Sequence, residues 1–298
     1  MANSLTAYTP ELWSQEAIAI LRERIVLPRL VRRDFSADLA QYGDTVNTRK
    51  PSKMTAGTVD PDTGVSVQNA AATNVAVTLN QHKHATFRIS DREASKSFQN
   101  LVEQFLDPAV LAVANAIDLS LAGLYADIPW LIDVASAGAI KDKINAARTR
   151  LNKNLAPSEM RYAVMSDDDD GAVANLDILS KVNESGGSQT LREGAIGRFK
   201  GFDFFRSSNI VNVGSPGVRH NILFQRDAFT LVVRNLATAT GSTPGAMQTV
   251  AQDPDAGLSL RMTLSYNPTL LSTQVTVDTL YGVKTLDSSL AAVLRASY

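Results

Sequence analysis

The sequence GLSLRMTLSYNPTLLSTQVTVDTLYGVKTLDSSLAAVL, residues 257–294, says more about the fold than any other stretch of this chain. Apolar and polar residues alternate over 258–266 and again over 275–283, which is the period of a β-strand with one buried face. Asn267-Pro268 breaks the alternation, because proline lacks the N–H that a sheet requires. The segment therefore predicts two long strands separated by a turn.

A similar alternation runs from 74 to 89, where Val77, Leu79 and Ile89 share one face and polar residues, His82 and His84 among them, fill the other. It follows an extended run at 44–49 and a stretch from 51 to 65 that is rich in turn-forming Pro, Gly and Asp. The pattern predicts a projecting hairpin whose strand edges need a partner.

Two helices are predicted beside these strands. Thr9-Pro10-Glu11 is a helix start, and Pro28 is expected to end that helix. The capping box at 90–93 opens a longer helix with two apolar stripes. Pro108 separates the stripes, so the helix is expected to kink or restart there, with Asp107 as a new cap. Pro108 is thus the predicted hinge.

Between 127 and 257 the periodicity is mixed. Short elements are predicted there: a helix at 140–153, a strand at 161–165, a helix at 172–179, a tight hairpin at 196–206, a strand at 222–224, a helix at 226–235 and a long loop at 237–257.

Composition limits the function. The 298 residues include 29 Lys+Arg and 30 Asp+Glu, a net charge of -1, and no basic block. Proteins that bind DNA tightly by themselves usually carry such a block, so we expect weak, non-specific contact at most. The absence of cysteine excludes disulfides and thiolate metal sites. We expect neither a signal peptide nor a membrane span.

The acidic run at 166–171 is the strongest metal candidate. Ser166, Asp168, Asp170, Gly171 and Asp177 match the first, third, fifth, sixth and twelfth positions of a calcium loop, but the first and twelfth residues are atypical. A strand-to-helix turn whose acids oppose the helix dipole explains the run better. We therefore predict no metal site, with Asp168, Asp170 and Asp177 as weak candidates.

Catalytic patterns are absent from the sequence. It has three histidines, no nucleophile elbow, no Walker motif and no H-E-x-x-H. His82 and His84 share a strand face but have no evident third metal ligand. The chain is therefore predicted to be no enzyme, with no catalytic residue and no cofactor.

Several stretches together resemble the major capsid proteins of tailed bacteriophages, which have the α+β Hong Kong 97-type fold. They are LWSQEAIAILRERIVLPRLVRRDF at 12–35, GDTVNTRKP at 43–51, LREGAIGRFKGFDFFRSSNI at 191–210 and the closing segment at 257–294. They occur in the order that this family has, and the resemblance covers nearly the whole chain.

The resemblance implies a division of the chain into five parts. These are an N-terminal arm at 1–42, an extended loop at 43–90, the spine helix of a peripheral domain at 91–127, an axial domain at 128–257, and strands that return to the peripheral domain with the C-terminus at 258–298. The spine helix of such proteins bends differently in precursor and expanded shells, which implies a hinge at Pro108.

The resemblance also implies a function. The chain would self-assemble as hexamers and pentamers of an icosahedral shell around double-stranded DNA, in the host cytoplasm, and remain in the virion. A separate scaffolding protein and a portal would be partners. Contacts between subunits are expected at Trp13, Arg49, Lys50, Lys53, Asp60 and Asp62. Trp13 is also expected to be a packing anchor.

Two alternatives remain open. The same fold builds the shells of encapsulin-like cellular compartments, which enclose protein. An Asp-rich metal-dependent enzyme centred on 167–170 is the alternative from a different functional class.

Overall fold

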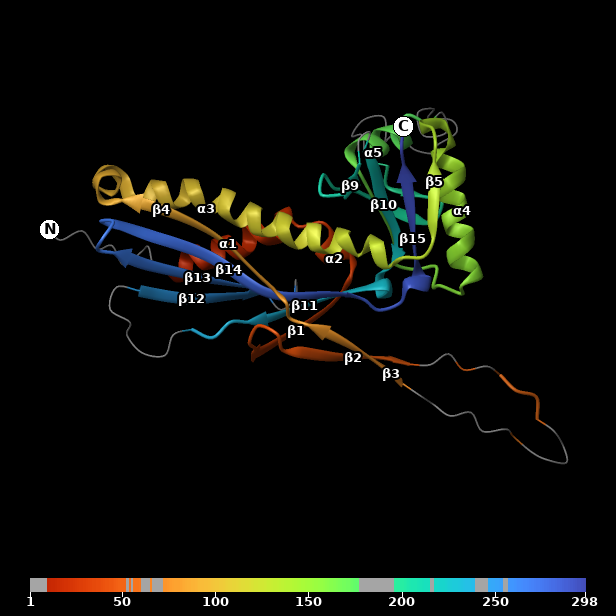
Figure 1. The fold of residues 1–298 in the computed structure, drawn as a ribbon, viewed down its shortest axis with the longest axis horizontal. Helices are drawn as coiled ribbons and strands as arrows, with labels where there is room; N and C mark the ends of the chain where they lie inside the picture. The colour runs from red at the N-terminus through yellow and green to blue at the C-terminus, as the bar shows by residue number, and fades with distance from the viewer. Residues whose placement is uncertain are drawn as a thin grey trace.

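The computed structural model describes residues 10–51, 54, 56–59, 65, 72–176, 196–214, 217–238, 246–253 and 257–298. These residues form a six-stranded sheet, a seven-stranded sheet and a two-stranded ribbon. We call the first sheet with its helices the six-stranded body and the second the seven-stranded body. Figure 1 shows a long helix lying along the six-stranded sheet, the seven-stranded body at one end of that helix, and the ribbon projecting away from both bodies.

The six-stranded body is built around its longest strand, β14. The strand order is β1-β11-β14-β13-β12, and β4 also pairs with β14. The strands are β1 (Arg32–Leu39), β4 (Gln81–Ser90), β11 (Phe229–Asn235), β12 (Ala246–Asp253), β13 (Leu258–Asn267) and β14 (Ser272–Thr285). The two strands predicted from 257–294 are confirmed as β13 and β14, which pair antiparallel.

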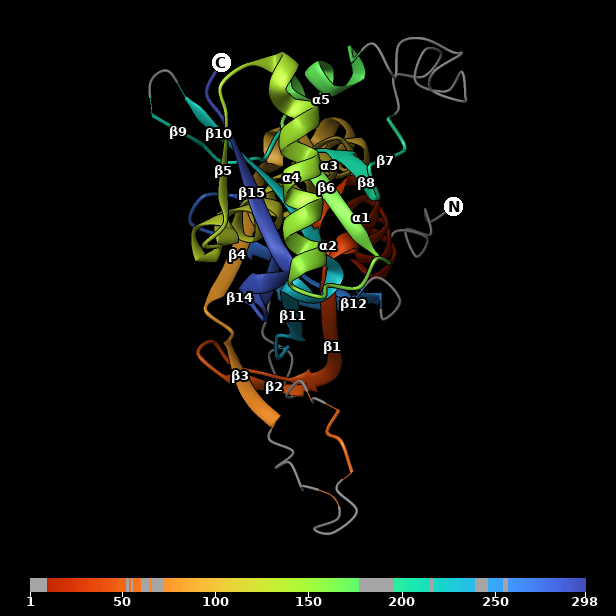
Figure 2. The ribbon, with the colours of Figure 1, turned by 90° about the vertical axis from the view of Figure 1, so that its right-hand side faces the viewer.

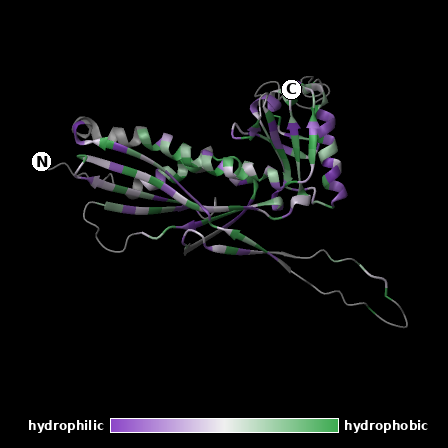
Figure 3. Ribbon diagram, viewed as in Figure 1, coloured by the Kyte–Doolittle hydropathy of each residue, from purple (hydrophilic) through white to green (hydrophobic). Residues whose placement is uncertain are grey.

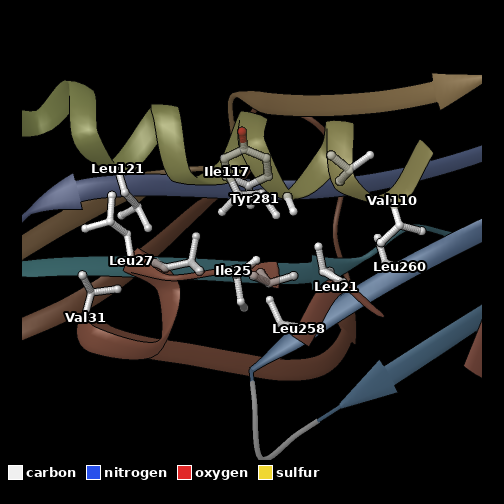
Figure 4. Packing of buried hydrophobic residues seen from close by; sticks show 14 of the residues in the cluster. Leu21, Ile25, Leu27, Val31, Val110, Ile117, Leu121, Leu258, Leu260 and Tyr281 are labelled. Carbon is white, nitrogen blue, oxygen red and sulfur yellow. The ribbon is translucent and has the colours of Figure 1, made fainter. Parts of the chain in front are cut away.

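Three helices pack with this sheet: α1 (Pro10–Arg24), the single turn α2 (Leu27–Leu30) and α3 (Asp91–Ala122), which continues into the 3-10 turn η2 (Gly123–Asp127). Pro28 lies in the first turn of α2, so the prediction that it ends the first helix is wrong by one turn. Figure 4 shows Val110, Ile117 and Leu121 of α3 facing Leu21 and Ile25 across the core.

The stretch Phe105–Asp127 is long and apolar enough to cross a membrane, by length and composition alone. That finding corrects the expectation that the chain has no such stretch. The inner face of this helix, including Val110, Val113, Ile117 and Leu121, is fully buried against α1 and the sheet. A core helix of a folded domain has the same composition.

Pro108 lies inside α3, and the helix continues through it. The predicted restart, with Asp107 as a cap, is therefore wrong. Pro108 is on the exposed side of the helix, between the buried residues Leu106 and Ala109. Water can hydrate the carbonyl that loses its hydrogen bond there, so the proline is tolerated without ending the helix.

The seven-stranded body has the order β5-β15-β10-β6-β8-β7, and β9 also pairs with β10. Its strands are β5 (Leu131–Val134), β6 (Arg161–Met165), β7 (Arg198–Phe199), β8 (Phe202–Arg206), β9 (Asn212–Val213), β10 (Val218–Gln225) and β15 (Ala291–Ala296). The helical elements are η3 (Ala137–Ala139), α4 (Ile140–Lys153), α5 (Asp167–Ala174), η4 (Arg226–Ala228) and η5 (Ser288–Leu290).

Both faces of this second sheet are covered. On β15, Val293 packs in the main core that α3 shares, whereas Ala292 and Leu294 pack under α4. The predicted helix 140–153 is confirmed with Ile144 and Leu151 on its buried face, and Figure 3 shows its outer side as hydrophilic. The two bodies therefore share a continuous core.

Several predictions in the middle of the chain need correction. The segment 226–235 is not a helix but the 3-10 turn η4 followed by β11. Residues Phe229–Asn235 of β11 are all buried between neighbouring strands, where β-branched side chains pack well. The predicted loop 237–257 contains β12, and the predicted helix at 172–179 instead begins at Asp167. The hairpin at 196–206 is confirmed, with positive φ at Lys200 and Gly201 as a type I′ turn requires.

The domain boundaries expected from the sequence cut across the two sheets. β11 and β12 come from the expected axial range 128–257 but join the six-stranded sheet. β15 comes from the expected range 258–298 but joins the seven-stranded sheet. The chain therefore passes between the two bodies several times, and the order of elements along the sequence does not reveal these crossings.

The ribbon consists of β2 (Thr45–Pro51) and β3 (Ala72–Thr78), paired antiparallel. Figures 1 and 2 both show it leaving the bodies. The run 74–89, expected as one strand of the projecting hairpin, is divided: β3 ends at Thr78, and β4 joins the large sheet beside β14. Residues 79 and 80 separate the two strands, so only the part before this break belongs to the ribbon.

The base of the ribbon is fixed by a small apolar cluster and by one glycine. Val77 and Leu79 are buried against Val232 and Leu280. A Cβ on Gly282 of β14 would collide with the carbonyl oxygen of Thr78. The ribbon can thus approach the sheet closely only because residue 282 has no side chain.

Gly282→Ala should therefore destabilise the protein by about 1–3 kcal/mol, because the added methyl group collides with a backbone atom that cannot move freely. Gly123→Ala is the matched control, since a Cβ there meets nothing within 4 Å. Chemical denaturation measures both. Equal stability of the two variants would contradict a close approach at Gly282.

Candidate functional site

The acidic run at 166–171 forms a buried polar cluster in the seven-stranded body. Asp169 is fully buried. Its carboxylate accepts hydrogen bonds from Arg219 at 3.0 and 3.1 Å, from Asn221 at 2.6 Å, from the Tyr298 hydroxyl at 2.7 Å and from Ser166 Oγ at 2.7 Å. The cluster joins α5, β10 and the C-terminal residue.

These hydrogen bonds decide the charge of Asp169. Burial acts to raise its pKa, but the donors from Arg219, Asn221, Tyr298 and Ser166 outweigh burial, and the pKa lies below its ordinary value. Burial and the bond to Asp169 raise the pKa of Tyr298. Asp169 is thus a charged and fully paired side chain.

The predicted strand-to-helix turn is confirmed. Ser166 is the N-cap of α5, and its hydroxyl accepts from the Asp169 N–H at 3.3 Å. Asp168 is exposed and pairs with Arg219 at 3.4 Å. Burial raises the pKa of Asp170. Of the three weak metal candidates, Asp168 is thus paired with a guanidinium, and Asp177 lies outside the described residues.

His82, the other metal candidate, is engaged within its sheet. Its Nε2 lies 2.7 Å from Asp278 Oδ2, and Arg261 holds the same buried carboxylate at 2.6 and 3.1 Å. His84 contacts Thr86 Oγ1 at 3.2 Å. No group of three His, Cys, Asp or Glu side chains that could hold a metal occurs among the described residues.

The residues expected to contact other subunits lie in different places: one in the main core, two on the ribbon, and three outside the described residues. Trp13 is 5% exposed in the main core, so it is a packing anchor, and its expected role in subunit contact is corrected. Arg49 and Lys50 lie in β2, on the ribbon. Lys53, Asp60 and Asp62 lie outside the described residues.

The ribbon is the best candidate for a contact with another molecule. Its described side chains are mostly exposed, and a hydrogen bond of 2.9 Å joins Asn47 and Asn74 across the two strands. Within the described part of the chain, β2 and β3 pair only with each other, which leaves both outer edges unpaired. An isolated two-stranded ribbon is marginally stable, and a third strand or another surface would stabilise it.

A second buried acid links three segments. Asp118 of α3 accepts a hydrogen bond from the Val26 N–H, just before α2, at 3.3 Å, and Asn209 from the loop before β9 is another donor. Burial raises the pKa of Asp118 to about 6, although these donors and Arg29 act to lower it. The sequence contains a signal for this buried acid, because Asp118 is the one acidic residue among the apolar residues on the buried face of the described part of α3.

No protein-family model matches this chain, and no curated protein sequence does. Solved structures do. A structure of Mycobacterium phage Che8 matches with 19% identity and a TM-score of 0.67, over 91% of this chain and 90% of that one. The capsid structure of cyanophage P-SCSP1u matches with 13% identity and a TM-score of 0.63, over 91% and 88%.

The chain has the Hong Kong 97-type capsid fold. A virus-like particle from Pyrococcus furiosus shares this capsid fold, with 11% identity and a TM-score of 0.53 over 95% of this chain and 98% of that one. The predicted α+β class and the predicted capsid fold are thereby confirmed.

Asp169→Asn should destabilise the protein by about 3 kcal/mol, because Arg219 would lose its buried carboxylate. Asp168→Asn is the control and should change stability by less than about 1 kcal/mol, because the ion pair of Asp168 with Arg219 is exposed to solvent. Because the folded state lowers the pKa of Asp169, its stabilisation is present above the ordinary pKa and is lost as pH falls below about 4. Urea unfolding at pH 7 and pH 3 measures this, and an equal loss at both pH values would contradict it.

Asp118 has the opposite pH dependence. The folded protein binds a proton there at a higher pH than the unfolded chain, so its burial destabilises the fold above about pH 6 and not below about pH 4. Asp118→Asn should therefore stabilise the protein by up to about 2 kcal/mol at pH 8, with no gain at pH 4. Asp142→Asn, at an exposed position of α4, is the matched control for replacing an aspartate by an asparagine. A gain that does not depend on pH would exclude ionisation of Asp118 as the cause.

Proposed function

We propose that this chain is the major capsid protein of a tailed bacteriophage and self-assembles into the icosahedral shell around the double-stranded DNA genome. The observation that carries the proposal is a ribbon that projects from a subunit with a capsid fold and whose two outer edges are unpaired in the described part of the chain. Another copy can complete those edges, and the same contact repeated around a shell closes it.

In such a capsid protein the two bodies have different roles. The six-stranded body with α3 as its spine is the peripheral domain, and the seven-stranded body is the axial domain around which hexamers and pentamers form. Assembly takes place in the host cytoplasm with a separate scaffolding protein and a portal. The net charge of -1 fits weak, non-specific contact with the packaged DNA.

The alternatives have less support. A metal-dependent enzyme at 167–170 would need open ligands, but Arg219 holds Asp168 and Asp169. A shell around a protein cargo would have the same fold, and the content of purified native particles distinguishes it from a phage capsid.

The ribbon should be required for assembly and not for folding. Replacing residues 49–74 with Asn-Gly would close β2 on β3 at the paired residues Thr48 and Val75, leaving the buried base intact. This variant should unfold cooperatively, like the wild type, but remain dispersed under conditions where the wild type forms particles. Electron microscopy and sedimentation measure this. Shells formed by the variant would contradict the proposal, as would a wild type that never assembles.

We also propose that Pro108 is a weak point where α3 bends as the shell matures. Proline removes one backbone hydrogen bond from the exposed side of the helix. Pro108→Ala should restore that bond, permit assembly and raise the temperature at which precursor shells expand. Particle diameter against temperature measures this, and an unchanged midpoint would show that Pro108 has no part in expansion.

A further inference from the structure

The turn after α4, residues 154–160, has an unusual residue at its first corner. Helix α4 ends in a Schellman cap: the Ala156 N–H donates to the Leu151 carbonyl at 3.0 Å, and the Leu155 N–H donates to the Asn152 carbonyl at 3.0 Å. This cap places Leu155 in the left-handed region, with φ of 56°. Glycine is the usual residue at this position, because a Cβ is crowded there.

A leucine at this position is also unusual because of its exposure to solvent. It is 82% exposed, the highest value among the large apolar side chains that the structure describes. Met160, at the other end of the turn, also has a positive φ, of 53°, and is 48% exposed. Both the left-handed backbone conformation and the exposure of Leu155 are unfavourable for a leucine in the isolated subunit.

The turn is nevertheless held firmly. The buried Arg161 donates to the carbonyls of Pro157 and Ala156 and to Asn152 Oδ1, at 2.6 to 2.7 Å. Asn154 donates to the Ser289 carbonyl at 2.6 Å, and the Arg226 N–H donates to the Met160 carbonyl at 3.0 Å. The backbone that carries Leu155 is therefore held in one conformation, and little conformational entropy would be lost when a partner covers the side chain.

We propose that Leu155 is a contact residue through which the seven-stranded body packs against a second copy of this chain. This inference rests on the proposed function, in which other copies surround each subunit. The turn, NLAPSEM, carries Glu159 as its one charged residue, so it fits an apolar protein surface and not a phosphate backbone. Burial of Leu155 at such a contact removes the exposure that the free subunit shows.

Leu155→Gly separates this role from a structural one. Glycine adopts the left-handed conformation without crowding, so the dispersed subunit should melt about 2 °C higher than the wild type. The same variant loses the apolar contact, so the concentration needed for assembly should rise about tenfold or more. A residue that packs within its own subunit would lower the melting temperature instead, and that result would overturn the proposal.

Two further variants at the same position complete the test. Leu155→Asn tolerates the left-handed conformation but is polar, so its assembly should be weakened as well. Leu155→Met keeps an apolar side chain and should assemble like the wild type. If the wild type assembles and Leu155→Gly or Leu155→Asn assembles equally well, this inference fails and the proposed function stands. If the wild type does not assemble under any condition, the proposed function fails, and this inference fails with it.

Discussion

The pairing of β14 is the constraint on which the rest of the structure depends. This one strand is bonded along its length to β4, β11 and β13. Its Tyr281 is fully buried, and the hydroxyl donates to the Ala116 carbonyl of α3 at 3.1 Å and lies 2.9 Å from Ser120 Oγ. Its next residue, Gly282, lets the base of the ribbon approach. The sheet, the long helix and the ribbon are thus oriented by two adjacent positions of a single strand.

The same arrangement explains why the ribbon and the bodies behave differently. The bodies share a continuous core, in which Val164, Ile222 and Val293 of the second sheet pack with residues of the first. Apolar burial on that scale supplies most of the folding free energy. Among the described residues, the ribbon is attached to the bodies through a small separate cluster in which Val77 and Leu79 pack against Val232 and Leu280. Such a subunit can fold while the backbone N–H and C=O groups on the outer edges of the ribbon have no partner strand, and these edges are then available for assembly.

The sequence predicted the elements whose pattern has a local cause. The alternation in 257–294, the amphipathic helix at 140–153 and the Ser166 cap are confirmed, because one buried face or one hydrogen bond defines each of them. β11 was mistaken for a helix, since a short apolar run buried on both faces has no period. The cluster around Asp169 was missed because its donors, Arg219 and Tyr298, are distant in the chain, and only the fold brings them together.

Hydrogen exchange at the backbone amides of β2 and β3 tests the central claim most directly, which is that the ribbon is completed by another copy of the chain. In the dispersed subunit these amides should exchange fast, whereas the amides of β13 and β14 should already be protected by the core. In assembled particles the amides of β2 and β3 should become protected as well. Equal exchange of β2 and β3 in dispersed subunits and in particles would contradict the account.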